Sequence, residues 1–255
     1  MIARALLLVW LAAMAPAHAH MGPHPEAGVA FDQHIGAAIP LDARFTDAHG
    51  AVASLREAIA GQPTVLVLGY AQCHELCATT VPGVAEALDG ARLVADRDYR
   101  AMFVSIDARE DARALADVVS RLPAADRRGW RILGGNDAGV RRLAQAVGFR
   151  YRYEPERDAF AHPAGFVVLT AQGVVSRYFF GVRFDPEEVR RAIGDARQGN
   201  TGSLSDRLLL LCYHFDPLTG RYSETIVGVL RALGIASLLA AALVFARSRK
   251  RRAAA

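Results

Sequence analysis

The stretch from Thr64 to Cys77, TVLVLGYAQCHELC, joins an apolar run to a pair of cysteines. Residues 64–68 are all β-branched or leucine, which is typical of a central strand buried on both faces. Cys73 and Cys77 are four residues apart at the expected start of a helix, and this spacing puts two sulfurs on one face, one turn apart. Such a pair suits a disulfide or a two-thiolate metal site.

The segments on either side of the cysteines alternate between strand and helix patterns. An extended segment at 38–45, a turn at 47–50 and a second short strand predict a small hairpin before the apolar run. The later strand patterns lie at 101–106, 130–133 and 149–153, and after a charged turn at 154–158 a hairpin pairs the apolar run that follows His162 and ends at Leu169 with 174–180. The helix patterns lie at 79–88, 111–122, 137–147 and 185–197. This order predicts an α/β domain with a thioredoxin-like fold and an N-terminal hairpin. The cysteines lie at its first strand-to-helix switch, where ligand sites collect in open α/β sheets.

The two ends of the chain have the composition of export and membrane segments. Residues 1–19 combine Arg4, a short apolar run and a small-x-small cleavage site, which predicts a signal peptide. Residues 226–246 are long and apolar enough for a transmembrane helix, with Arg231 near its outer end. The cations that follow it place the C-terminus in the cytoplasm. We therefore expect a single-pass protein of the inner membrane, with its globular domain in the periplasm or outside.

These features divide the chain into six segments. In order they are a signal peptide (1–19), a His/Pro-rich linker (20–30), a thioredoxin-like domain (31–198), a juxtamembrane segment (199–225), a transmembrane helix (226–246) and a basic cytoplasmic tail (247–255). The formal net charge of +4 becomes −1 without the five tail cations and −2 without Arg4 as well. A basic footprint for nucleic acid is therefore lacking outside the anchor.

The chain has three cysteines, Cys73, Cys77 and Cys212, which are too few for a disulfide scaffold. A close pair in an exported, cysteine-poor domain favours redox or metal chemistry over a structural crosslink. Cys212 and His214 lie between the domain and the anchor, where an interfacial packing role competes with a second metal site or a motif that docks a partner protein.

Three features together resemble the Sco/SenC family of copper-binding cytochrome oxidase assembly proteins. They are the Cys-x-x-x-Cys after a buried strand, Ser105-Ile106-Asp107 at the end of the next strand, and His162 before the penultimate hairpin. The similarity covers residues 38–196. Residues 208–222, with their LLLLCYHFDP run, resemble a bacterial branch of that family that carries a C-terminal anchor.

The resemblance implies that Cys73, Cys77 and His162 bind one copper ion and deliver it during cytochrome c oxidase assembly. Two thiolates and one imidazole form a soft site that favours Cu(I), with Cu(II) as a second candidate ion. The implied partners are the copper-accepting subunit of a terminal oxidase and an upstream copper donor or thiol reductant. Such a protein is a metallochaperone, not an enzyme in the usual sense.

Two features of the sequence keep alternatives open. His74 and Ala78 stand where family members usually have proline, so His74 rivals His162 as the third ligand. Pro163 stands where thioredoxin-like oxidoreductases carry a cis-proline, which keeps a thiol-disulfide oxidoreductase acting on the oxidase or on another copper protein as the alternative function. The three-residue spacer between the cysteines counts against that alternative. A peroxidase has no support beyond the cysteine pair.

Overall fold

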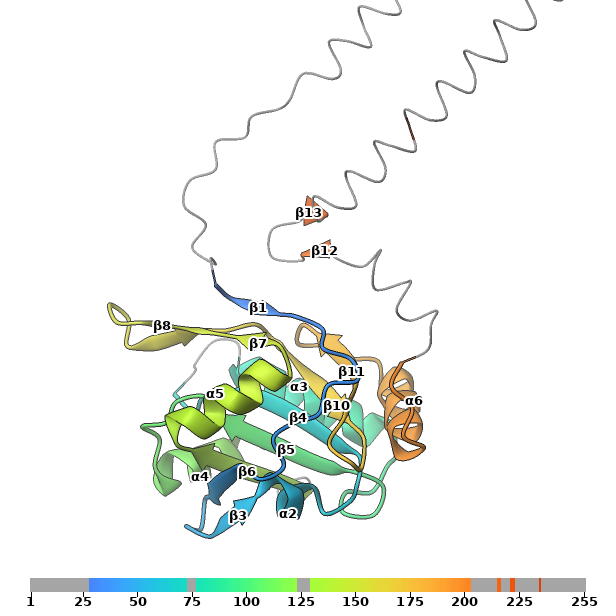
Figure 1. Ribbon diagram of the computed structural model, residues 1–255, viewed down its shortest axis with the longest axis horizontal. Helices are drawn as coiled ribbons and strands as arrows, with labels where there is room; N and C mark the ends of the chain where they lie inside the picture. Colours follow the sequence, from blue (N-terminus) through green and yellow to red (C-terminus); the bar gives the residue numbers. More distant parts are fainter. Residues whose placement is uncertain are drawn as a thin grey trace, which may run out of the picture.

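A seven-stranded sheet forms the centre of the computed structural model, which describes residues 28–72, 77–122 and 129–202, together with 215–216, 221–222 and 234 (Figure 1). The strand order is β11-β10-β4-β5-β6-β2-β3, in which β4, β5 and β6 are parallel and the other neighbours are antiparallel. The strands are β2 (Arg44–Asp47), β3 (Val52–Ser54), β4 (Thr64–Gly69), β5 (Arg100–Ser105), β6 (Trp130–Gly135), β10 (Gly165–Leu169) and β11 (Val175–Phe180). This is the predicted α/β architecture, with the N-terminal hairpin present as β2 and β3.

Alternating side chains of the central strands supply two cores, one on each face of the sheet. On β4, Leu66 and Leu68 belong to one core and Val65 and Val67 to the other. All six residues of β4 are buried, because helices cover both faces. The apolar run that predicted a central strand therefore has the expected burial.

Five helices cover the sheet in the part of the chain that the structure describes. They are α2 (Leu55–Ile59), α3 (Cys77–Gly90), α4 (Ala112–Arg121), α5 (Asp137–Ala146) and α6 (Pro186–Arg197). Buried residues of α2 and α5 belong to one core, and those of α3, α4 and α6 belong to the other. Polar caps set several of the starts: Asp111 accepts a hydrogen bond from the amide of Ala114, and Asn136 accepts one from the amide of Gly139.

The strand directions bring three loops to one end of the sheet. Gly69 of β4 lies opposite Ser105 of the parallel strand β5, so the segments that follow these two strands leave the sheet side by side. Strand β10 runs antiparallel to β4, with Val167 opposite Leu66, so the segment that precedes β10 arrives at the same end. Three segments therefore meet the sheet at neighbouring positions: the cysteine loop, the turn after β5 and the segment that leads into β10.

The segment before β10 contains a hairpin that the sequence patterns did not predict. β8 (Arg152–Glu154) pairs with β9 (Ala159–Ala161), while β7 (Phe149–Arg150) pairs with β1 (Ala30–Phe31). The expected strand at 149–153 is thus divided between two small sheets. Between β9 and β10 lies Pro163, which has no N–H to donate to a ladder.

Two further predictions from the sequence concern the start of α3 and the two ends of the chain. Helix α3 begins at Cys77, not at Thr79, so Pro82 lies within the helix and not in its first turn. No helix among the described residues is long and apolar enough to cross a membrane. The predicted signal peptide lies outside the described residues, as does the predicted membrane helix at 226–246 apart from Gly234.

Candidate metal site

His162 lies between β9 and β10 and is 7% exposed. Its Nδ1 donates a hydrogen bond to the carbonyl oxygen of Pro163 at 2.9 Å. Because a carbonyl oxygen only accepts, this bond puts the proton of the neutral ring on Nδ1 and makes Nε2 the nitrogen that can bind a metal. Metal-ligating histidines are commonly oriented by such a bond from the other ring nitrogen.

The ring of His162 packs among aromatic side chains from the start of the cysteine loop and from β7. Its centroid lies 5.7 Å from that of Tyr70, at 82°, and 5.9 Å from that of Phe149. Tyr70 also contacts Phe160 of β9 at 5.5 Å. Since Tyr70 is three residues before Cys73, the predicted histidine contacts the segment that leads to the predicted thiols.

The other predicted site residues lie largely outside the described residues. Cys73 and His74 do so entirely, as do Cys212 and His214. Cys77 is the first residue of α3, but the structure describes only its backbone. The three-ligand set, and the rivalry between His74 and His162, therefore stay predictions. No group of three His, Cys, Asp or Glu side chains within the described residues has a metal-binding arrangement.

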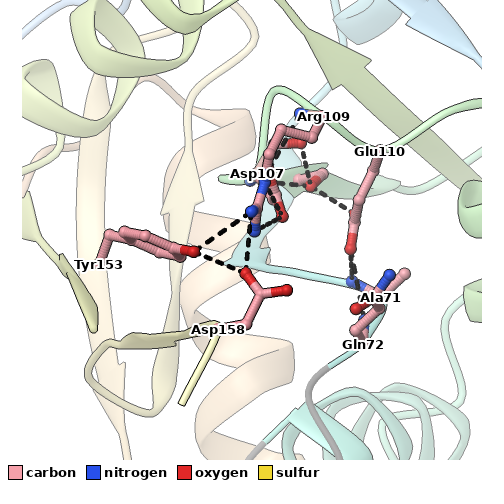
Figure 2. Close-up of polar contacts among 8 residues, drawn as sticks. Ala71, Gln72, Asp107, Arg109, Glu110, Tyr153 and Asp158 are labelled. Atoms are coloured by element: carbon pink, nitrogen blue, oxygen red, sulfur yellow. Dashed lines mark hydrogen bonds and ion pairs between the residues drawn. The ribbon is translucent and has the colours of Figure 1, made fainter. Parts of the chain in front are cut away.

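Glu110 connects the start of the cysteine loop to the end of β5 (Figure 2). Its Oε1 accepts the backbone amides of Ala71 and Gln72 at 2.6 and 3.3 Å, and its Oε2 accepts the hydroxyl of Ser105 at 2.6 Å. Burial raises the pKa of Glu110, although these three donors act in the opposite direction. The peptide groups of the loop are thus held by a half-buried carboxylate, and Arg121 donates in addition to the carbonyl oxygen of Ala71.

Arg109 connects the same turn to the β8–β9 hairpin. Its Nε and Nη2 donate to the Asp107 carboxylate at 2.8 and 2.7 Å, and its Nη1 donates to Oδ1 of Asp158 at 2.8 Å. The Tyr153 hydroxyl donates to the same Asp158 oxygen at 2.6 Å. The guanidinium carbon also lies 5.0 Å from the ring centroid of Tyr153 and 5.8 Å from that of Phe160.

Arg109 and Glu110 are residues that sequence reasoning did not single out. Asp107, which did belong to the sequence motif, is 5% exposed and has its carboxylate compensated by Arg109. The available signal was position: the run DARED at 107–111 follows a buried parallel strand that neighbours the strand before the cysteines. The His162–Pro163 peptide bond is trans, as are all described peptide bonds.

The sequence model of a family described as SCO1/SenC matches residues 36–197. This interval contains Cys73, Cys77, His162 and the turn at 107–110, and it is more than half of the chain. No curated protein matches the chain.

Solved structures share the fold at low sequence identity. A crystallised protein of Aquifex aeolicus VF5 is 21% identical with a TM-score of 0.59, over 65% of this chain and 95% of that one. Arabidopsis thaliana ScoI, crystallised with copper bound, is 15% identical with a TM-score of 0.52, over 64% and 99%. BsSco, described as having a disulfide switch and as a member of the Sco family of cytochrome c oxidase assembly proteins, is 15% identical with a TM-score of 0.53, over 65% and 95%.

Proposed function

The chain belongs to the SCO1/SenC family, and we propose that it is a copper chaperone that delivers its metal during cytochrome c oxidase assembly. Its ligands are Cys73, Cys77 and His162. The observation that carries the proposal is the placement of His162, buried and in ring contact with Tyr70 at the start of the cysteine loop. The orientation of its ring by the Pro163 carbonyl supports a ligand role.

The chemistry of this ligand set fits a transferred metal. Two thiolates satisfy Cu(I), and a single imidazole adds a third, exchangeable ligand. An acceptor protein can then take the ion by stepwise ligand exchange, since no closed four-ligand cage has to be broken. We expect Cu(II) to depend more strongly on the imidazole nitrogen than Cu(I) does, because Cu(I) is the softer ion.

The cellular location of the domain follows from the predicted segments at the two ends of the chain. A signal peptide at 1–19 and a membrane helix at 226–246 would place the domain on the periplasmic or outer side, tethered to the membrane that holds the oxidase. The partners are the copper-accepting subunit of the oxidase and an upstream copper donor or thiol reductant. Tethering raises the effective concentration of the chaperone near a membrane-bound acceptor.

An anaerobic Cu(I) competition titration of the reduced chain in detergent tests the ligand set. Wild type should bind one equivalent, Cys73→Ser and Cys77→Ser should lose tight binding, and His162→Ala should weaken the affinity by about 10- to 100-fold. His49→Ala is the matched control, since His49 is exposed on the turn between β2 and β3. Equal affinity of wild type and His162→Ala would refute the three-ligand set, and a loss with His74→Ala would favour its rival.

A thiol-disulfide oxidoreductase is the second candidate function. Cys77 is the first residue of the 14-residue helix α3, and a helix N-terminus favours a thiolate. In that case His162→Ala should leave thiol-disulfide exchange unchanged, and reduced wild type should bind Cu(I) weakly. Tight copper binding that is sensitive to His162 would instead favour the chaperone.

A further inference from the structure

The turn at 107–110 lies between the two segments that carry the proposed copper ligands (Figure 2). Glu110 binds the segment that enters the cysteine loop, and Arg109 binds the hairpin that leads to His162. We propose that Arg109 and Glu110 are positioning residues that set the placement of the cysteine pair relative to the histidine. This inference rests on the proposed function, because it assigns the two residues to the same copper site.

The cysteine half of the proposal follows from the bonds of Glu110. One carboxylate oxygen accepts two successive amides, of Ala71 and Gln72, and the other accepts Ser105, which is 0% exposed at the end of β5. Both oxygens are engaged, so the carboxylate has a fixed orientation. Cys73 follows the anchored Ala71 by only two residues in the sequence. The anchor therefore determines where the loop starts toward its first thiol.

The histidine half follows from the bonds of Arg109. The bidentate pair with Asp107 fixes the plane of the guanidinium, which leaves Nη1 directed at Asp158 in the turn of the β8–β9 hairpin. Tyr153 and Phe160 are register partners on β8 and β9, and the guanidinium lies near both rings. Phe160 is two residues before His162, so the contact acts on the strand that delivers the histidine.

A positioning role is more consistent with these contacts than a role in stability alone. The bond between Arg109 and Asp158 joins side chains that are 56% and 66% exposed, so this ion pair contributes little to the free energy of folding, whereas the pair of Arg109 with the buried Asp107 carboxylate does contribute. Glu110 and Arg109 attach to two different segments at the site, the start of the cysteine loop and the hairpin that precedes His162. Removing either one should therefore alter one half of the site while the fold persists.

Two substitutions of Glu110 distinguish the effect of its hydrogen bonds to the loop from the effect of its negative charge. A glutamine at this position can reproduce the bonds, since its carbonyl oxygen can accept both amides and its NH2 group can donate to the Ser105 oxygen. Glu110→Ala should weaken Cu(I) binding by about tenfold, whereas Glu110→Gln should stay within about twofold of wild type. The control is Glu187→Ala on α6, which removes an exposed carboxylate paired with Arg190.

The effect of Arg109 substitutions is measured as Cu(II) affinity, which depends more strongly on the imidazole than Cu(I) affinity does. Arg109→Met should lower Cu(II) affinity by about tenfold and reduce the nitrogen hyperfine coupling in the electron paramagnetic resonance spectrum, with a smaller effect on Cu(I). Arg109→Lys keeps the charge but cannot bridge Asp107 and Asp158 in the same fork, so it should resemble Arg109→Met. Arg190→Met is the matched control.

Hydrogen–deuterium exchange of the copper-free chain tests the positioning independently of metal. Glu110→Ala should raise exchange in residues 66–76, and Arg109→Met should raise it in residues 152–162, each with little change in the other segment. A uniform rise throughout the domain, or copper effects without the local changes, would overturn the inference. If the exchange pattern holds but wild type fails to bind copper, the positioning stands and the proposed function falls.

Discussion

Two carboxylates at opposite ends of β5 are compensated in different ways. Asp98, just before the strand, is 9% exposed and accepts bonds from Arg97, Arg197 and the amide of Val94, and its pKa is lowered, chiefly by Arg97. Glu110, beyond the other end of the strand, accepts bonds from a hydroxyl and from loop amides, and burial raises its pKa. Among the described residues, no arginine or lysine donates to Glu110.

The difference separates a structural cluster from one that serves the site. The partners of Asp98 lie at the end of α6 and just before β5, next to elements that are already held by the core. The partners of Glu110 include a loop that bears the predicted ligands. The bonds of Asp98 therefore join elements that the core already holds, whereas two of the bonds of Glu110 hold the start of the cysteine loop.

The largest effect on stability is expected from Asp98→Ala. This change leaves the amide of Val94 and two guanidinium groups without their acceptor, and we expect a loss of about 2–3 kcal/mol in the free energy of unfolding. Urea denaturation followed by circular dichroism measures it. Copper affinity should stay within about twofold of wild type, because the site lies at the far end of β5. A tenfold loss of affinity would show that the two ends are not independent.

The two carboxylates should also give stability profiles of opposite slope with pH. The lowered pKa of Asp98 means that its contribution is present above its ordinary value of 3.8 and is lost as the pH falls through the folded value. The raised pKa of Glu110 means that its contribution is present below 4.5 and is lost as the pH rises through the folded value. Asp98→Asn should therefore flatten the acid limb, and Glu110→Gln should gain stability relative to wild type as the pH rises. Parallel slopes for the two variants would remove the distinction.

Most of the fold follows from sequence patterns, while the β8–β9 hairpin does not. The runs at 64–68 and 101–106 predicted β4 and β5 because strands buried on both faces need continuous apolar side chains. β8 and β9 have three residues each and no buried positions, so their local pattern shows only the charged turn between them. Their pairing accompanies contacts with Arg109, which is 44 residues from Tyr153 and 49 from Asp158 in the sequence.

The candidate site likewise contains residues that the sequence predicted and residues that it did not. The cysteine spacing and His162 carry motif information, and the sequence named them, although the cysteine side chains lie outside the residues that the structure describes. Arg109 and Glu110 carry no spacing signal, because their roles depend on which loops meet at the end of the parallel strands. Charged residues that follow a buried strand are usually solvated, so composition alone does not select these two.

The smallest effect is expected from Arg197→Gln at the end of α6. Arg197 donates to the carbonyl and to Oδ1 of Asp98 at 2.8 and 3.0 Å, but its side chain is 52% exposed and Arg97 still pairs with the carboxylate. We expect a loss below about 1 kcal/mol, and one that shrinks in high salt because exposed charges are screened. Arg190→Gln on the same helix is the control, and urea denaturation in low and high salt measures both. A loss as large as that of Asp98→Ala, unaffected by salt, would mean that the bond from Arg197 to the Asp98 carbonyl holds α6 in place. Hydrogen bonds to peptide groups would then be important at both ends of β5, and not only at the end near the cysteine loop.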